Sequence, residues 1–549
     1  MKEKINRLLK EFIAIPSVSC TRDEIQAAEY IRDYFSGLEY FKKNPEFYGL
    51  YDIPDDPYDR KVAYGFIKGN SDNTVVLMGH IDVVGVEDYG EAIPLAYTMG
   101  EELEQVLAGK ALPPDARKDM DSGEWEWGRG VMDMKAGVII HLALMEEYAQ
   151  KVLEGTLPGN IFFMGVPDEE SYSAGMRAGV TLLSEYKDKY NLHINLMIDG
   201  EPCSVTADDE MIFTIGSVGK VMPVVMVQGV TAHVGHRFAG ITPLGILSRM
   251  ELKTDESLVF TDSYEGEATM PPTWANMRDM KRKYDVSIPL RASGYMTVLS
   301  FQTTPDVIMD ELKRIAKESF EESVEALNNL YQEFKKLNKF ERKEKIYYEP
   351  LILSYADLTA RLKEEKGEAF DVFYAETMKK IEGKVLSSEL NYQEATVELM
   401  EETLNFADIK QPLVLIAFAP PYYLAINSDL MPGHEGSGTK LFQEAGEFMK
   451  RYDRTLTKEY YALGISDMSY GGMDHPFDTD AFSKNTPVWG KLYNIDFESI
   501  ANLNMPCIFL GPIGKDPHQW TERTLKKSLY EEAPELNRYF IDKYMNETL

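Results

Sequence analysis

Short apolar runs bounded by polar turns recur in the first part of the chain and predict the strands of a buried sheet. They span about residues 62–68, 75–78, 160–166 and 194–198. The run at 75–78 is continuous and opens with two β-branched residues, which is typical of parallel strands covered on both faces. Helical patterns before Pro16, over residues 21–38 and from about Ala136 supply the covering layers. The pattern therefore predicts an α/β domain with a central mixed, mostly parallel sheet.

The pattern changes near residue 212, where two antiparallel strands, a helix over 243–252 and a strand pair around 286–301 are expected. A tract rich in Glu, Lys and Leu with helical spacing follows over residues 305–410, and an apolar strand closes it. We interpret residues 212–428 as an inserted α+β (ferredoxin-like) domain with a long helical extension. The extension is most simply a solvated part of this domain, with a docking surface as the alternative. The first domain comprises residues 1–211 and 429–549.

The rest of the first domain is predicted to contain a helix over 438–451, a strand around 505–514 and a last helix over 522–540. Residues 86–124 form a long acidic excursion, rich in Pro and Gly and without strong periodicity. Excursions of this kind inside compact domains are usually functional or disordered.

Composition narrows the class of protein. A chain of 549 residues is too long for one ordinary core, and its net charge of −32 disfavours nucleic acid and anionic membranes as partners. The first helix lacks the features of a signal peptide, and no run of about 18 apolar residues predicts a membrane span. The three cysteines fit a reducing cytoplasm without a CxxC-type metal site.

Carboxylates and histidines follow several predicted strands and turns in succession. In open α/β sheets, the carboxyl ends of parallel strands form one edge at which sites are built. Two imidazoles with several carboxylates and no thiolate suit zinc, cobalt or manganese. One carboxylate shared between two ions, with a spare carboxylate as general base, would make a two-metal hydrolytic centre. The candidates are His80, Asp82, Asp133, Glu169, Glu170, Asp199, Glu201 and His518.

Four motifs carry a resemblance to a known family, in the order GHIDVV, WGRGVMDMKAG, VPDEES and GPIGKDPHQWTE. They are similar to motifs of the di-zinc metallopeptidases that include glutamate carboxypeptidase, succinyl-diaminopimelate desuccinylase, acetylornithine deacetylase and aminoacylase. The length and the IDGEP form look most like the arginine-utilisation (RocB-type) branch. The resemblance also implies a cis peptide after the bridging ligand. It makes His80 a metal ligand oriented by Asp82, Asp133 the bridging ligand, Glu169 the general base, Glu170 a ligand and His518 the last ligand.

The remaining ligand has two candidates. The GEP of IDGEP is similar to the desuccinylase and deacetylase pattern and points to Glu201, whereas the Asp-Gly pair resembles the tripeptidase branch and points to Asp199. Both side chains project from the same face of one strand, so either could reach a metal. We favour Glu201.

The inserted domain carries two further points of comparison with the family. GVTAHVG resembles the family's loop whose histidine, here His233, reaches the partner subunit's active site to hold the oxyanion. The family's substrate-carboxylate Arg, by contrast, is missing: Val286 replaces an Asn, and Phe301 or Gln302 replaces the Arg. Arg291 lies in what looks like a small insertion and could compensate.

These inferences predict a cytoplasmic, metal-dependent hydrolase with two divalent ions, which cleaves an amide bond in a small peptide or N-acyl amino acid. A dipeptidase or aminopeptidase is the alternative within the enzyme class. A catalytically silent binding or regulatory protein is the rival from another class, and retention of Glu169 argues against it because a binding protein has no need of the base. A homodimer through residues 212–428 is expected, since His233 would otherwise have no site to serve.

Overall fold

The computed structural model describes residues 1–155, 157–206, 210–338 and 347–549, which form two compact units. Unit 1 comprises residues 1–218, 424–474 and 495–549, and unit 2 comprises residues 219–423 and 475–494. The sequence placed the boundaries at 212 and 428 and did not separate residues 475–494 from the first domain. That segment belongs to unit 2 because it packs there: Phe418 donates its amide to the carbonyl of Asn485 and stacks on Phe482.

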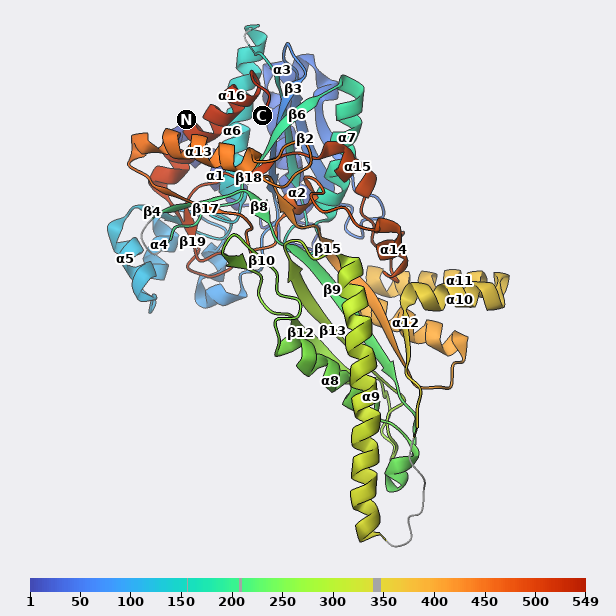
Figure 1. The fold of residues 1–549 in the computed structure, drawn as a ribbon. Coiled ribbons are helices and arrows are strands. Elements are labelled where there is room, and N and C mark those ends of the chain that lie inside the picture. Colours follow the sequence, from blue (N-terminus) through green and yellow to red (C-terminus); the bar gives the residue numbers. More distant parts are fainter. Residues whose placement is uncertain (156, 207–209, 339–346) are drawn as a thin grey trace. The chain divides into compact units, whose positions relative to one another are not determined.

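Unit 1 is built on a six-stranded sheet in the order β1-β2-β5-β3-β6-β18 (Figure 1). The pairs β5–β3, β3–β6 and β6–β18 are parallel, and β1–β2 and β2–β5 are antiparallel. The prediction of an α/β domain with a mixed, mostly parallel sheet is confirmed. The strands are β1 Tyr48–Asp52, β2 Lys61–Ile67, β3 Asn73–His80, β5 Asn160–Val166, β6 His193–Asp199 and β18 Cys507–Phe509.

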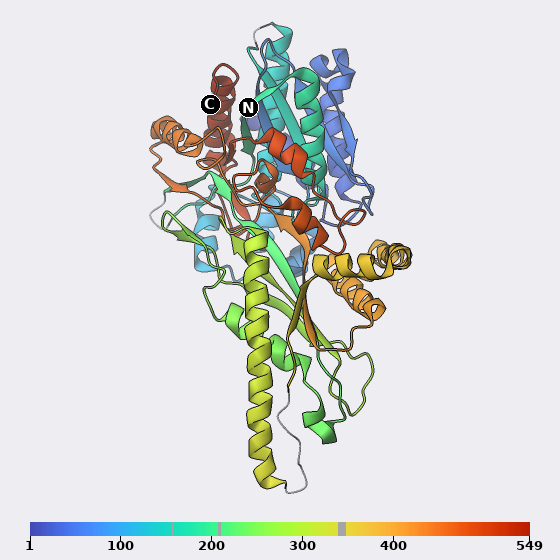
Figure 2. The same ribbon diagram turned by 45° about the vertical axis from the view of Figure 1, so that its right-hand side comes forward.

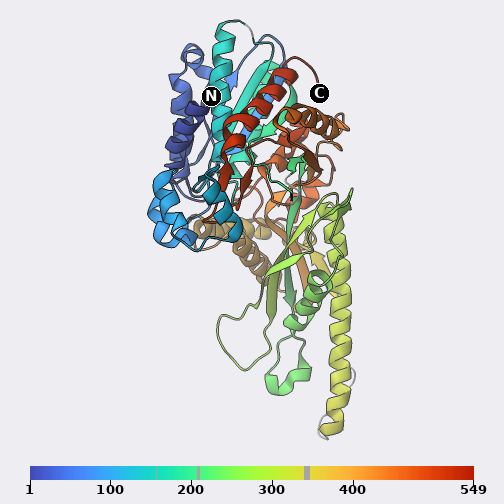
Figure 3. The ribbon, with the colours of Figure 1, turned by 90° about the vertical axis from the view of Figure 1, so that its left-hand side faces the viewer.

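Helices cover both faces of this sheet. Gly79 and Gly165 are paired on adjacent strands. A Cβ on Gly79 would lie 2.8 Å from Val138 of α6, and a Cβ on Gly165 would lie 2.8 Å from Ile31 of α2, so both helices pack closely on one face. Figure 3 shows α16, in red, on that side beside α6. Tyr186 of α7 packs on the opposite face, against Phe66 and Phe162. The helices are α1 Lys2–Ile13, α2 Glu24–Gly37, α3 Glu39–Lys43, α6 Lys135–Leu153, α7 Ala174–Tyr190, α13 Ser437–Met449, α15 Phe497–Leu503 and α16 Ala533–Tyr544.

Two stretches of unit 1 take their structure from long-range packing. Residues 86–124 are ordered as a 3₁₀ segment and the helices α4 Glu101–Ala108 and α5 Pro114–Ser122, around a small core that includes Tyr89 and Trp127. Residues 523–525 form strand β20 (Arg523–Leu525) rather than the start of the last helix, because they pair with β4 (Trp125–Trp127). In both cases long-range packing overrides a weak local pattern.

The predicted hairpin after residue 212 is also wrong. β7 (Met211–Thr214) pairs in parallel with β17 (Leu456–Glu459), and β8 (Gly216–Ser217) pairs with β16 (Ile426–Asn427). Gly216 permits this change of partner, since a Cβ there would lie 2.3 Å from the carbonyl oxygen of Ile426. Only the third segment, β9 (Gly219–Gln228), enters the sheet of unit 2.

Unit 2 contains a five-stranded sheet in the order β12-β13-β9-β15-β14. Without β14, the chain order β9-α8-β12-β13-α9-β15 and this strand order give the ferredoxin-like arrangement that the sequence predicts. The helix α9 spans 33 residues, and Figure 2 shows it running along the sheet and beyond its strands. The elements are α8 Pro243–Asp255, β12 Thr273–Asp279, β13 Arg291–Ser300, α9 Pro305–Leu337, β14 Leu351–Ser354, α10 Tyr355–Lys366, α11 Glu368–Leu386, α12 Tyr392–Ala407, β15 Leu413–Tyr423 and α14 Thr479–Lys484.

Among the described residues, no helix has the length and apolar character needed to cross a membrane.

Candidate metal centre

The candidate ligands meet at the carboxyl edge of the sheet in unit 1. β3 lies between β5 and β6. β3 and β5 end together at the pair His80 and Val166, and β6 ends two residues earlier, where Asp199 pairs with Met78, so all three strands end at the same edge of the sheet. His80 is the last residue of β3, and the loops that follow β5 and β6 lie on either side of it.

One ligand group joins His80, Asp133 and Glu201. His80 Nε2 lies 2.9 Å from Asp133 Oδ1 and 3.7 Å from Glu201 Oε1. One ligand atom from each of the three residues lies within 4.8 Å of the others, which is close enough to hold a single ion.

A second ligand group joins Asp133, Glu170 and His518. His518 Nε2 lies 3.1 Å from Asp133 Oδ2 and 2.9 Å from Glu170 Oε2. Asp133 therefore faces the two groups with its two oxygens, one toward each histidine. This is the arrangement expected of a carboxylate shared between two ions.

The closely spaced carboxylates of this cluster need positive charge nearby. In the part of the chain that the structure describes, the two histidines are the only basic side chains in ion pairs with Asp133, Glu170 and Glu201. Burial raises the pKa of Glu170, and the nearby charge of Asp133 adds to the shift. The hydrogen bonds that Asp133 and Glu170 accept raise the pKa of His518 to about 10. A cluster of carboxylates and imidazoles without thiolate fits zinc, cobalt or manganese.

Glu169 lies beside both groups and is 8 % exposed. It belongs with His80 and Glu170 to a third set of closely spaced donor atoms. Burial raises its pKa well above the usual carboxyl range; the charge of His80 opposes this shift, and the charges of Glu170 and Glu201 reinforce it. A carboxylate with a raised pKa next to a metal site has the properties of a general base.

Asp82 is fully buried and contacts two parts of the site. His80 Nδ1 lies 3.0 Å from the backbone carbonyl of Asp82 and 3.6 Å from its carboxylate, so the carbonyl is the closer orienting group. The carboxylate accepts the amides of Glu169 and Glu170, at 3.1 and 3.2 Å, and the hydroxyl of Ser19 at 2.6 Å. Asp82 thus fixes the loop after β5 and also orients His80.

Asp199 is the less suitable of the two candidates for the remaining ligand. Its carboxylate accepts the hydroxyl of Ser466 at 2.9 Å and the amide of Glu201 at 3.4 Å, and burial raises its pKa to about 7. It is absent from all three donor sets among the described residues, whereas Glu201 takes part in one.

Two residues that the sequence did not single out hold the backbone of the ligands Asp133 and His518. Glu522 is fully buried and accepts the amides of Met132 and Asp133, at 3.0 and 3.3 Å. Arg129 pairs with Glu522 at 2.7 Å and donates to the carbonyl of His518 at 3.3 Å. The peptide between Asp133 and Met134 is cis, as the resemblance implies. Arg129 and Glu522 lie within the quoted motifs, so their position could have marked them.

His233 and Arg291 lie in unit 2. The amide of Gly235 donates to His233 Nδ1 at 3.0 Å, so the proton of the neutral ring is on Nε2. Arg291 donates to Gln228 at 2.9 Å and Asn405 at 2.6 Å and is 7 % exposed, which makes it a packing residue of its own sheet rather than a substitute for the missing substrate-binding Arg.

Comparisons with known proteins identify relatives, a shared fold and a family. Two relatives from Bacillus subtilis match nearly the whole chain: the uncharacterized protein YqjN at 28 % identity over 100 % of this chain and 97 % of its own, and protein RocB at 29 % over 97 % and 93 %. The crystal structure of aminopeptidase PepT from Bacillus cereus shares the fold, with a TM-score of 0.52 at 12 % identity over 99 % of each chain. The predicted resemblance to the RocB-type branch is confirmed. The model of "Peptidase family M20/M25/M40" matches residues 76–364, more than half of the chain, and the chain therefore belongs to this family of peptidases and related hydrolases.

Proposed function

We propose that the protein is a metal-dependent hydrolase that cleaves an amide bond in a small peptide or an N-acyl amino acid. Two divalent ions would be held by His80, Asp133 and Glu201 and by Asp133, Glu170 and His518. The observation that carries the proposal is the position of Asp133, whose two oxygens lie within 3.1 Å of the two histidines. Zinc is the first choice of metal, and cobalt or manganese suits the same donors.

The side chains divide the chemistry among them. Bound ions would polarise the scissile carbonyl and lower the pKa of a water molecule. Glu169 accepts the proton of that water and later gives it to the leaving amine. Asp82 fixes the backbone of Glu169 and orients His80 through its carbonyl, while Glu522 holds the backbone of Asp133.

A role in arginine or amino-acid utilisation is the finer part of this proposal. It is supported by the similarity to RocB along almost the whole chain. A dipeptidase or aminopeptidase is the second candidate, and the fold shared with an aminopeptidase favours it. A cytoplasmic location stays a prediction.

We further propose that His233 completes the site of a second copy of the chain. The resemblance of its loop to the family's oxyanion-binding loop supports this role, and the tautomer with the proton on Nε2 suits a donor to an oxyanion. The enzyme would then be a homodimer through unit 2. Its His233→Ala variant should keep both ions and lose activity.

A hydrolysis screen tests the proposed function. Protein reconstituted with Zn²⁺, Co²⁺ or Mn²⁺ is assayed on dipeptides and N-acyl amino acids, with Glu169→Gln as the matched control for contaminating hydrolases. We expect turnover that a chelator abolishes and that Glu169→Gln lacks. A folded, metal-loaded protein that binds these compounds and hydrolyses none of them would support the catalytically silent alternative.

A further inference from the structure

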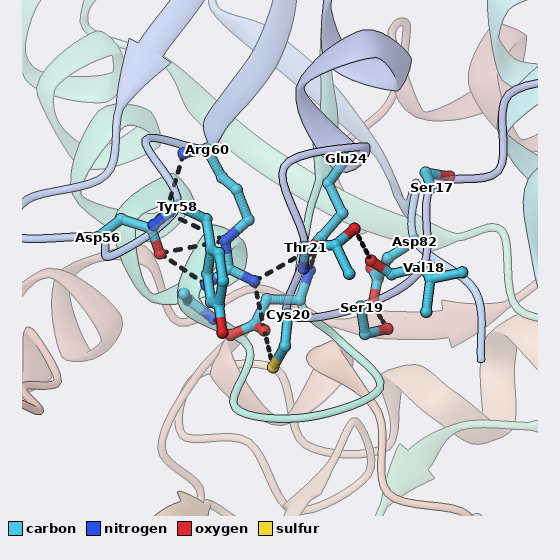
Figure 4. Close-up of polar contacts among 12 residues, drawn as sticks. Ser17, Val18, Ser19, Cys20, Thr21, Glu24, Asp56, Tyr58, Arg60 and Asp82 are labelled. Carbon is cyan, nitrogen blue, oxygen red and sulfur yellow. Dashed lines mark hydrogen bonds and ion pairs between the residues drawn. The ribbon is translucent and has the colours of Figure 1, made fainter. Parts of the chain in front are cut away.

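A second cluster of buried charge lies in unit 1, around Arg60. The guanidinium contacts carboxylates from three separate segments: Asp56 at 2.6 Å in its own loop, Glu24 at 3.0 Å in α2 and Asp168 at 2.5 Å. All four side chains are at most 3 % exposed. Figure 4 shows Arg60 between Asp56 and Glu24, near the segment that carries Ser19 and Cys20. We call these four residues the Arg60 cluster.

Asp168 connects this cluster to the candidate metal centre, because it directly precedes Glu169. Its φ of 73° lies in the left-handed region, which is uncommon for a residue other than Gly. Its carbonyl accepts the amides of residues 171, 172 and 173, and its carboxylate accepts the amide of Ala174 at 3.1 Å. Its own amide donates to Glu24 at 2.8 Å. These bonds fix the direction in which the chain leaves Asp168 toward Glu169 and Glu170.

The loop that carries Glu169 and Glu170 is therefore held from two sides. On one side, the carboxylate of Asp82 accepts both of their amides. On the other side, Arg60 and Glu24 hold Asp168. The second anchor needs a planar cation with several donors, because one lysine ammonium cannot make the same set of bonds to three carboxylates.

We propose that Arg60 is a positioning residue for the base and for one metal ligand, acting through Asp168 and Glu24. The ion pairs of Arg60 are with Asp56, Glu24 and Asp168, so its effect on Glu169 and Glu170 passes through the backbone that follows Asp168. Functional carboxylates must be held within about 0.5 Å of their productive place, and misplacement by about 1 Å costs on the order of 10²-fold in rate. The proposal rests on the proposed roles of Glu169 and Glu170.

The test compares variants of the cluster with a matched ion pair elsewhere in unit 1. Arg60→Met removes the cation, Arg60→Lys keeps the charge without the fork, and Glu24→Gln keeps the shape of its side chain. The control, Arg454→Met, removes one of the two basic partners of the buried Glu532: Arg454 lies 3.2 Å from its carboxylate and Lys527 lies 3.4 Å from it. For each variant, kcat, KM, the affinities for both ions and the melting temperature are measured on the full-length protein.

We expect Arg60→Met to lower kcat about 10- to 100-fold with KM within about twofold, and to weaken the ion held by Glu170 by about tenfold. Arg60→Lys and Glu24→Gln should give smaller changes in the same direction. Arg454→Met should keep the wild-type kcat per folded molecule even if its melting temperature falls by as much as that of Arg60→Met.

Wild-type kcat and metal affinities in folded Arg60→Met would overturn the proposal. Losses of activity and metal affinity that are proportional to the unfolded fraction in both Arg60→Met and Arg454→Met would overturn it too. Where Arg60→Met does not fold, Arg60→Lys and Glu24→Gln decide by the same criteria. If the wild-type protein hydrolyses no substrate, the proposed function fails, and the metal titration of the Arg60 variants still decides this proposal.

Discussion

The candidate metal centre and the Arg60 cluster both bury several carboxylates, and they differ in the source of positive charge. Arg60 supplies a permanent cation to three carboxylates at once. The metal centre has only His80 and His518 as basic partners among the described residues. Because buried carboxylates need compensating charge, a cluster without Arg or Lys takes it from bound metal ions or protons. We therefore expect the first cluster to bind metal ions and the Arg60 cluster to fix the loop beside it.

The largest effect should come from the residue that the two ligand groups share. Asp133→Asn removes a charge from both groups at once, so activity should fall to the level of metal-free protein. The loss should be at least as large as the roughly 10²- to 10⁴-fold cost of losing a general base. It is measured as kcat/KM at saturating metal. Recovery of wild-type activity at high metal concentration would show that Asp133 is not the shared ligand.

The two adjacent glutamates separate base from ligand within the same centre. Glu169→Gln keeps the shape of the side chain and cannot accept a proton, so kcat should fall roughly 10²- to 10⁴-fold at unchanged metal content. Glu170→Gln should instead weaken one ion and recover part of its activity in excess metal. Equal metal loss in both variants would contradict this division of roles.

Chelation should distinguish the two clusters by stability. Removal of metal leaves the carboxylates of the centre without their cations, whereas the Arg60 cluster keeps its own. Metal at about one hundred times its dissociation constant should stabilise the wild-type fold by about 3 kcal/mol. The measurement is thermal unfolding with and without chelator, with Asp133→Asn as the control that should not respond. A wild-type melting temperature that chelation leaves unchanged would count against metal binding.

A buried histidine without carboxylates gives the smallest effect and the opposite sign of shift. His141 lies in α6 with Nε2 3.2 Å from Asn537, and burial lowers its pKa to about 4. The unfolded chain therefore binds a proton below about pH 6.5 that the folded chain refuses until about pH 4. The free energy of unfolding should fall by about 2 kcal/mol between pH 7 and pH 5, relative to His141→Gln. Equal changes in the free energy of unfolding between pH 7 and pH 5 for the two proteins, measured by urea denaturation, would contradict this.

The sequence predicts the parts of the site that depend on strand ends. His80, Glu169, Glu170 and Glu201 follow apolar strands that must lie side by side, so their convergence follows from the α/β pattern. The resemblance adds the roles of these residues and of His518, which no periodicity could supply.

The residues that sequence reasoning missed act across long distances in the chain. Arg60 lies 108 positions before Asp168 and looks like one more charge in a polar loop. The small core of residues 86–124 and the strand at residues 523–525 depend on each other in the same way, since β20 pairs with β4 beside that core. Contacts of this kind have no local periodic signal, so only the folded structure reveals them.

The most direct test of the account is the number of metal ions bound per chain. Wild-type protein is reconstituted with zinc, freed of excess metal and analysed for its metal content beside His80→Ala and Arg454→Met. We expect two ions per chain for the wild type and Arg454→Met, and close to one for His80→Ala, because Asp133, Glu170 and His518 still form the second group. Folded wild-type protein that retains no metal would contradict it.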